Sequence, residues 1–214
     1  MKNKFLLSGI FFALFLLLIV AVRSIDVAAV GPEGTSIGFA HVNKAVHDFF
    51  GVNLFWYSVT DRPGILAIFT AFVFAVTGFF QWIKRKSIWK VDKEILVLGG
   101  LYIVVIGLYV LFENVIINYR PVIMPGYERP EASFPSTHTM IVCVIMGSAV
   151  PLIKKYIRNG KGKALLQAFC GLVIGATVIG RLISGVHWFT DILGGILISA
   201  ALLLFYAGIV EKPD

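Results

Sequence analysis

Charged side chains are scarce in this sequence. Aspartate, glutamate, lysine and arginine make up 14% of the 214 residues, whereas hydrophobic residues make up 58%, and the mean hydropathy is +0.87. In a soluble globular protein roughly a quarter of the residues are charged. This chain therefore has too few polar side chains to cover its apolar surface. A water-soluble fold is excluded, and much of the surface must face lipid.

Cysteine is also scarce, and this limits metal and redox sites. Cys143 and Cys170 both lie inside apolar runs, where we expect packing residues and not a disulfide. Two cysteines without clustered histidines form no zinc pattern. The net charge of +7 does not indicate a nucleic-acid partner either, because the basic residues stand in short clusters between apolar runs. We expect no metal, no cofactor and no bound nucleic acid.

Long apolar runs are abundant. A helix needs about 20 mostly apolar residues to cross the bilayer core. Six runs approach this length, and they cover residues 5–22, 63–83, 95–118, 135–153, 164–183 and 190–210. The second run opens at Arg62-Pro63-Gly64, where proline favours a helix start. The sequence thus predicts an all-α integral membrane bundle of six transmembrane helices, in a single domain over residues 1–214.

Two segments near the N-terminus need separate interpretation. The first run has the basic start of a secretory signal, but its eighteen unbroken apolar residues exceed the usual signal core, so we expect an uncleaved anchor. In residues 35–60, apolar side chains recur near helical spacing with His41, Lys44 and His47 between them. This pattern predicts an amphipathic interfacial segment, or alternatively an ordinary loop helix packed on the bundle.

Lysine and arginine set the orientation of the spans. Thirteen of the nineteen basic residues fall near the two termini and in the loops after the second and fourth runs. Basic residues are enriched in cytoplasmic loops, and an even number of spans places both termini on one side. We therefore expect a multi-pass protein of the cell membrane with both termini in the cytoplasm. The loops after the third and fifth runs then face outside.

Several polar residues gather in those outer loops. The loop after the third run reads NYRPVIMPGYERPEASFPSTH, and the loop after the fifth reads GRLISGVHWFTD. Ionisable groups at a helix end near the membrane face are costly and usually mark a functional site. Six such polar residues lie within about a turn of a helix end: Arg120, Ser136, His138, Arg181, His187 and Asp191.

The types and spacing of these residues favour phosphoryl transfer. His187 and Asp191 are four residues apart at a helix start and share one face, so the carboxylate can orient one ring nitrogen and leave the other as a nucleophile. His138 lies at a second helix start, a favourable place for a bound phosphate, and can protonate a leaving oxygen. Arg120 and Arg181 carry planar forks that match phosphate oxygens.

Each of these residues also has a structural explanation when taken alone. Arg120 and Arg181 are each more often anchors to lipid head groups, and Asp191 can be a favourable first-turn acid. A zinc site at His138 and His187 lacks a third protein ligand. The functional interpretation rests on all six residues meeting at one face.

Three motifs join these residues along the chain. They read Glu113-x6-Arg120-Pro121, Pro135-Ser136-Thr137-His138 and Gly180-Arg181-x5-His187-x3-Asp191. In this spacing the sequence resembles the type 2 phosphatidic acid phosphatase family, which includes the vanadium haloperoxidases and carries K-x6-R-P, P-S-G-H and S-R-x5-H-x3-D. Glu113, Thr137 and Gly180 depart from the lysine, glycine and serine of the family.

The resemblance implies a metal-independent lipid phosphatase with its site at the extracytoplasmic face. By this resemblance, His187 is the nucleophile, Asp191 is its orienting partner and His138 is the general acid. The phosphate ligands that the resemblance implies are Arg120, Ser136, Thr137 and Arg181.

We therefore expect hydrolysis of a phosphomonoester or diphosphate on a membrane lipid through a phosphohistidine intermediate. Candidate substrates are undecaprenyl diphosphate, phosphatidate, phosphatidylglycerophosphate and a diacylglycerol diphosphate, and the outward site leans towards the polyprenyl carrier. One alternative is a phosphoryl transferase on the same scaffold. Another is a non-catalytic phospholipid-binding or transport protein, which Glu113 favours because it lowers the positive charge where the family has lysine. The sequence indicates no oligomeric state.

Overall fold

The computed structural model of the chain describes residues 2–211, and their secondary structure is helical. The α-helices are α1 (Lys2–Ser24), α2 (Ala40–Phe50), α3 (Leu54–Arg85), α4 (Lys93–Asn114), α5 (Thr137–Tyr156), α6 (Gly160–Ile183) and α7 (Phe189–Val210). The short 3-10 helices η1 (Pro32–Gly34) and η2 (Ile88–Lys90) lie in two of the connections.

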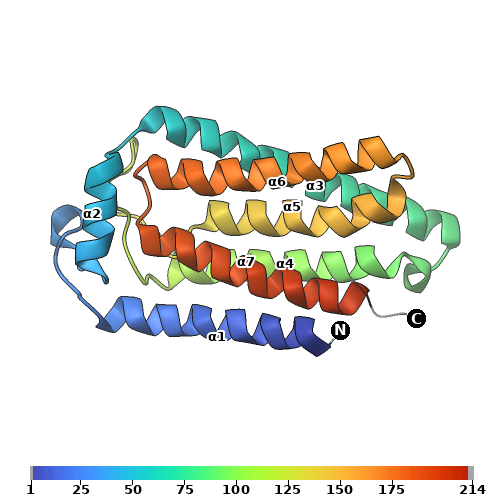
Figure 1. Cartoon of the computed structure of the whole chain (residues 1–214), viewed down its shortest axis with the longest axis horizontal. Coiled ribbons are helices and arrows are strands. Elements are labelled where there is room, and N and C mark those ends of the chain that lie inside the picture. Colours follow the sequence, from blue (N-terminus) through green and yellow to red (C-terminus); the bar gives the residue numbers. More distant parts are fainter. Residues whose placement is uncertain (1, 212–214) are drawn as a thin grey trace.

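Six of these helices, α1 and α3 to α7, are long and apolar enough to cross a membrane. They lie side by side along the long axis of the molecule, and α2 lies across one end (Figure 1). The prediction of an all-α bundle with six transmembrane helices is confirmed. For five of the spans the predicted limits agree with the structure to within four residues.

The predicted start of the second span is wrong, because α3 begins at Leu54 and not at Pro63. Asn53 starts the helix, since its side-chain oxygen accepts a hydrogen bond from Trp56 N at 3.1 Å. Pro63 lies inside α3, where it lacks a backbone N–H to donate but does not end the helix. The aromatic residues 55–57 therefore belong to the first turn of the span.

α5 lies at the centre of the bundle. It packs against α3, α6 and α7, and a larger share of it is buried than of any other span. Cys143 in α5 and Cys170 in α6 are buried free thiols, in agreement with the prediction that they are packing residues. Because α5 is held by neighbours on several sides, the residues at its N-terminus have a fixed position.

α1 packs along α7 and brings the two ends of the described chain together. The Ser8 hydroxyl donates a hydrogen bond of 2.8 Å to the Ala201 carbonyl oxygen. Lys4 and Glu211 form an ion pair at the end of this helix pair. Both ends of the described chain therefore lie at the same end of the bundle.

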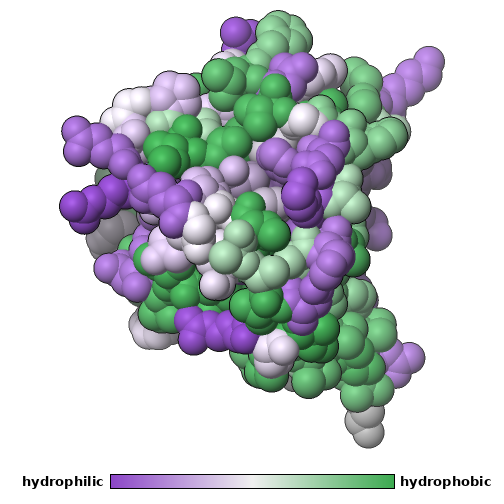
Figure 2. All heavy atoms as spheres, turned by 90° about the vertical axis from the view of Figure 1, so that its left-hand side faces the viewer, coloured by the Kyte–Doolittle hydropathy of each residue, from purple (hydrophilic) through white to green (hydrophobic). Residues whose placement is uncertain are grey.

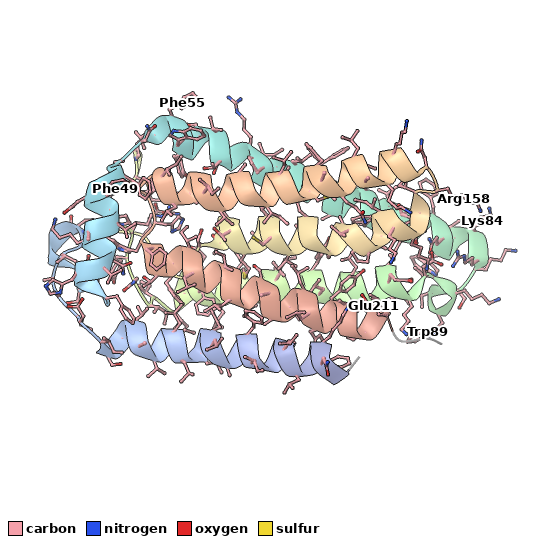
Figure 3. The ribbon with its side chains drawn as sticks, in the orientation of Figure 1. Phe49, Phe55, Lys84, Trp89, Arg158 and Glu211 are labelled. Carbon is pink, nitrogen blue, oxygen red and sulfur yellow. The ribbon has the colours of Figure 1, made fainter. Side chains whose placement is uncertain are left out.

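The basic loops after α3 and α5 lie at that end as well. Figure 3 labels Lys84 and Arg158 there, at the opposite end from Phe49 and Phe55. Lys212, which belongs to the same basic set in the sequence, lies outside the described residues. The bundle thus has one strongly basic end and one end that α2 covers.

One carboxylate joins the two basic loops. Asp92 accepts hydrogen bonds from Arg85 at 2.8 Å and from the Tyr156 hydroxyl at 2.5 Å. Burial acts to raise the pKa of Asp92, but these hydrogen bonds outweigh it and lower the pKa to about 2. Asp92 therefore stays ionised and holds the loops together.

α2 is tied to the bundle by one buried side chain. Asn43 donates from Nδ2 to the Gly38 carbonyl at 2.8 Å and to Thr190 Oγ1 at 2.9 Å, and its Oδ1 accepts from Thr190 N at 3.1 Å. On the outside of α2, Phe49 is 82% exposed. The segment was predicted to be either an amphipathic interfacial helix or a loop helix packed on the bundle. Each interpretation is partly correct, because α2 packs on α7 and also presents apolar side chains outward.

We predict that Asn43→Ala lowers the free energy of unfolding by about 1–3 kcal/mol, because it leaves buried polar groups at Gly38 and Thr190 unpaired. The measurement is the thermal unfolding midpoint in detergent. Asn114→Ala is the matched control, because the Asn114 amide donates to the Val110 carbonyl on an exposed part of α4. Equal midpoints for the two variants would contradict the anchoring role of Asn43.

Candidate active site

Polar side chains gather at the end of the bundle that α2 covers, where five segments meet. These are the starts of α3, α5 and α7, the end of α6 with the turn after it, and the loop between α4 and α5. Figure 2 looks onto this end and shows hydrophilic side chains beside hydrophobic ones. All of the predicted site residues lie on the last four of these segments.

His187 and Asp191 are both buried, with 4% and 0% of their surface exposed. His187 Nδ1 lies 3.5 Å from Asp191 Oδ2, which is longer than a normal hydrogen bond. His187 Nε2 lies 3.5 Å from Arg120 Nη1. One ring nitrogen therefore faces a carboxylate and the other faces a guanidinium.

Asp191 also starts α7. Its Oδ2 accepts a hydrogen bond from Trp188 N at 2.9 Å, so the structural explanation as a first-turn acid holds alongside the contact to His187. The backbone of Asp191 has a further partner, because its carbonyl oxygen accepts from Ser136 N at 2.9 Å. This bond joins the start of α7 to the start of α5.

The turn that carries His187 requires glycine at position 185. Gly185 has a φ of +66°, and a Cβ there would lie 1.9 Å from the Gly51 carbonyl oxygen. Only glycine avoids both the left-handed strain and the clash. Asn53 N donates to the Ser184 carbonyl at 3.0 Å. The turn therefore packs directly on the connection between α2 and α3, which fixes the direction of His187.

Arg120 lies in the loop between α4 and α5, which folds back on itself. Arg120 N donates to the Glu131 carbonyl at 2.9 Å, and Ser133 N donates to the Asn118 carbonyl at 2.9 Å. The Arg120 side chain turns towards His187, while its Nε lies 3.6 Å from Glu131 Oε2. The backbone pairing in this loop thus sets the position of the guanidinium.

Arg181 is at the end of α6 and is 1% exposed. Its guanidinium lies over the Tyr57 ring, 4.8 Å from the centroid, and its Nη2 donates to Asp61 Oδ1 at 2.8 Å. Nε and Nη1 of Arg181 are buried and have no hydrogen-bond partner among residues 2–211. Because buried donors without a partner are costly, these two nitrogens are well suited to an incoming anion.

Ser136, Thr137 and His138 form the start of α5. Ser136 is fully buried, and its hydroxyl oxygen caps the helix by accepting from Thr139 Oγ1 at 3.0 Å and from Thr139 N at 3.4 Å. The hydroxyl that we predicted as a phosphate ligand therefore has a structural role too. The His138 ring packs beside Gly64 of α3, where a Cβ would lie 3.1 Å from Nε2.

Asp61 is a residue of the site that the sequence analysis missed. Its Oδ1 lies 3.0 Å from His138 Nε2 and 2.8 Å from Arg181 Nη2, and its side chain is 48% exposed. The signal in the sequence was a carboxylate directly before Arg62-Pro63. A predicted helix start at Pro63 leaves Asp61 outside the span, and the sequence analysis gives this residue no role.

Two of the departures from the family motifs have clear surroundings. Glu113 is exposed near the end of α4 and, in the described part of the chain, has no hydrogen bond or ion pair with the arginines of the site. Gly180 is buried, and Thr60 of α3 fills the space where a side chain would lie, since a Cβ at Gly180 would be 2.1 Å from Thr60 Cγ2.

Burial, together with the positive charges of Arg120 and Arg181, holds the pKa of His187 well below its usual range. Removal from water and nearby cations both disfavour the charged imidazolium. His187 is therefore neutral at physiological pH. When its proton is on Nδ1, next to Asp191, the lone pair of Nε2 faces the Arg120 guanidinium.

An apolar groove of about 340 Å³ lies between α3, α4 and α5. Its lining includes Ile141, one turn along α5 from His138, and Ile68, one turn along α3 from Gly64. A second cavity, of about 290 Å³, is bordered by Arg120 and by the start of α3. The apolar groove therefore lies on the same two helices, α3 and α5, that carry Gly64 and His138.

Comparison with known proteins identifies the region that contains the motifs. Residues 112–213 match the family described as the PAP2 superfamily, and this stretch includes every motif position from Glu113 to Asp191. This part of the chain is thus similar to the PAP2 superfamily. The resemblance to the type 2 phosphatidic acid phosphatase family is confirmed.

One curated relative of the chain is phosphatidylglycerophosphatase B of Bacillus subtilis (strain 168). It is 31% identical over 119 residues, which make up 53% of this chain and 59% of that protein. The matched part therefore spans less than two thirds of the length of the relative.

A solved structure extends the comparison to nearly the whole chain. It is described as the first transmembrane PAP2 type phosphatidylglycerolphosphate phosphatase from Bacillus subtilis. The match has a TM-score of 0.65 at 23% identity and covers 97% of each chain. The two proteins thus share one fold, including the spans before residue 112.

We predict that Gly180→Ser, which restores the serine of the family, destabilises this protein by about 1–3 kcal/mol because it overpacks the contact with Thr60. Adding Thr60→Ala should recover the loss, since it removes the methyl group that the serine meets. Gly175→Ser on the same helix is the control, because a Cβ there meets nothing within 4 Å. Thermal unfolding midpoints of the three variants give the answer. A double variant no more stable than Gly180→Ser would show that Thr60 is not the obstacle.

Proposed function

We propose that the protein is a metal-independent lipid phosphatase that acts through a phosphohistidine intermediate on His187. The observation that carries the proposal is the buried His187–Asp191 pair, whose second ring nitrogen faces Arg120. A protein that only binds phosphate needs donors such as the arginines, but it does not need a neutral histidine held between a carboxylate and a guanidinium.

In the first step, the lone pair of His187 Nε2 attacks the phosphorus atom. The N–P bond forms as the bond from phosphorus to the leaving oxygen breaks, and His138 gives that oxygen a proton. Arg120 and the two unpartnered nitrogens of Arg181 hold the phosphate oxygens, where negative charge is greatest. Asp191 stabilises the ring, which becomes positive during attack. The 3.5 Å separation from Asp191 is expected to shorten as this charge develops.

In the second step, water attacks the phosphorus atom of the phosphohistidine. His138, which lost its proton in the first step, accepts one from the water. The N–P bond breaks and its electron pair returns to His187, so inorganic phosphate is released and both histidines regain their starting states. The described residues contain no group of three His, Cys, Asp or Glu side chains that could hold a metal ion, and no step above uses one.

A lipid substrate is supported by the apolar groove whose lining includes Ile141, one turn along α5 from His138. A phosphate held at the arginines would have its attached chain directed to the membrane-facing side of α3 and α5, where apolar side chains line about 340 Å³. Because a phosphatidylglycerophosphatase is among the relatives of the chain, phosphatidylglycerophosphate is the first substrate to test. Undecaprenyl diphosphate and phosphatidate are the next.

The orientation of the bundle follows from its two unlike ends. The loops after α3 and α5 carry most of the basic residues and lie at the end opposite the site. Under the preference of basic loops for the cytoplasm, the site faces outside and the ends of the chain face the cytoplasm. The non-catalytic alternative rested on Glu113, which makes no polar contact with the site arginines in the described part of the chain.

The test is phosphate release by purified protein in detergent, with excess chelator, from each candidate lipid. We predict chelator-resistant release from at least one lipid, and a loss of about 10⁴-fold or more in His187→Ala, because the nucleophile is absent. His41→Ala is the control, since His41 is an exposed histidine on α2 that pairs with Asp26. A folded His187→Ala protein that retains near-normal turnover would overturn the nucleophile assignment.

A further inference from the structure

Both arginines of the site already face a carboxylate. Arg120 Nε lies 3.6 Å from Glu131, a loose contact. Arg181 Nη2 lies 2.8 Å from Asp61 Oδ1, and the same oxygen lies 3.0 Å from His138 Nε2. A single carboxylate oxygen thus joins the most buried cation of the site to the predicted general acid.

Asp61 contacts two groups that the proposed mechanism also uses. In that mechanism Nε and Nη1 of Arg181 hold phosphate oxygens, and His138 gives its proton to the leaving oxygen. Asp61 contacts the third nitrogen of the same guanidinium, Nη2, and also His138 Nε2. A carboxylate and a phosphate beside the same guanidinium and histidine repel each other because both are negative. Phosphate and the Asp61 carboxylate therefore compete for this position.

The Asp61 side chain has room to leave. It is 48% exposed, whereas the Arg181 side chain that it contacts is 1% exposed. The arginine must stay and needs an anion, because burial of an unpaired guanidinium is costly. Asp61 can instead turn to the outer surface, where water or head groups solvate it. When phosphate binds at Arg181, it therefore replaces the Asp61 carboxylate as the anion beside the guanidinium.

We propose that Asp61 is a specificity-determining residue, an internal anion that occupies the phosphate position and that only a multiply charged phosphate displaces. The inference rests on the proposed function, since it takes Arg181 and His138 as the phosphate position. It adds the residue that selects terminal phosphomonoesters and diphosphates at this position. Phosphodiester lipids, which carry a single negative charge, are excluded.

The selection follows from the balance of charge. A diester brings one negative charge to Arg181 and displaces one, so its electrostatic gain is close to zero. A terminal monoester or diphosphate brings about two negative charges or more, which attract Arg181 and Arg120 together. Asp61 thus lowers the affinity of the site for every phosphate group. Binding remains favourable only for monoesters and diphosphates, because they carry more negative charge than the carboxylate that they displace. Proteins commonly gain specificity from a group that repels the wrong ligand. Here the wrong ligands are phosphodiester lipids, which make up the bulk of the membrane around this site.

The experiment compares wild-type protein with Asp61→Asn, which keeps the shape of the side chain and removes its charge. Asp48→Asn is the matched control, because Asp48 is an exposed carboxylate on α2 paired with Lys44. Inorganic phosphate is titrated against each purified protein in detergent, and its Kd is taken from the rise in the thermal unfolding midpoint. We expect the Kd to fall about tenfold or more in Asp61→Asn, since like charges no longer compete, and to stay unchanged in Asp48→Asn.

A second arm tests the selection between lipids. Phosphatidylglycerol, a diester, is added to nanodiscs that contain each protein and a fixed amount of phosphatidylglycerophosphate. We expect phosphatidylglycerol to inhibit Asp61→Asn several-fold more strongly than wild-type protein. Both measurements are repeated with Asp61→Ala, which also removes the charge. A folding defect in one of the two variants then does not decide the result.

Equal Kd values for phosphate in wild-type protein and both Asp61 variants would overturn the inference. So would a fall in kcat without a change in Kd, because Asp61 would then position His138 and would not compete with phosphate. The phosphate titration needs no turnover. If the wild-type protein hydrolyses no lipid, the proposed function fails, and the comparison of Kd values still decides the role of Asp61.

Discussion

Asp191 is fully buried at the start of α7, where its charge must be met by protein groups. One carboxylate oxygen accepts from Trp188 N, lies near His187 Nδ1 and so links the helix start to the histidine. Its backbone carbonyl accepts from Ser136 N and links the same helix start to α5. Because the cap of α7, the link between the starts of α5 and α7 and the contact with His187 all involve this residue, the site cannot be rearranged without disturbing the bundle.

The rest of the polar end follows from the cost of placing ionisable groups at the edge of an apolar bundle. Arg181 is held between the Tyr57 ring and Asp61, and Arg120 is set by the backbone pairing of its loop. These contacts satisfy the guanidinium groups only in part, which leaves buried donors directed into the site. Stability of the free protein and affinity for an anion are therefore opposed here. In the proposed mechanism, each carboxylate that stabilises an arginine also competes with the phosphate that the arginine would bind.

Much of the fold was readable from the sequence because six apolar runs and the positions of the basic residues leave few alternatives. The start of α3 was not, since Pro63 favours a helix start in isolation but is tolerated inside a helix that Asn53 has already begun. That error hid Asp61. The grouping of His138, His187 and the two arginines followed from motif spacing. The double role of Ser136 and the pairing of Gly180 with Thr60 needed the structure, because they depend on contacts between helices that are distant in the sequence.

The central claim is that phosphate passes through His187, and trapping the intermediate tests it most directly. Purified protein is mixed with phosphatidylglycerophosphate that carries a radiolabelled terminal phosphate, quenched in alkali within one turnover, and digested for peptide mass spectrometry. The account predicts label on the peptide that contains His187, stable in base and lost in acid, as expected for a phosphohistidine. Hydrolysis of the same lipid with no label on His187, or with label on another residue, would contradict it.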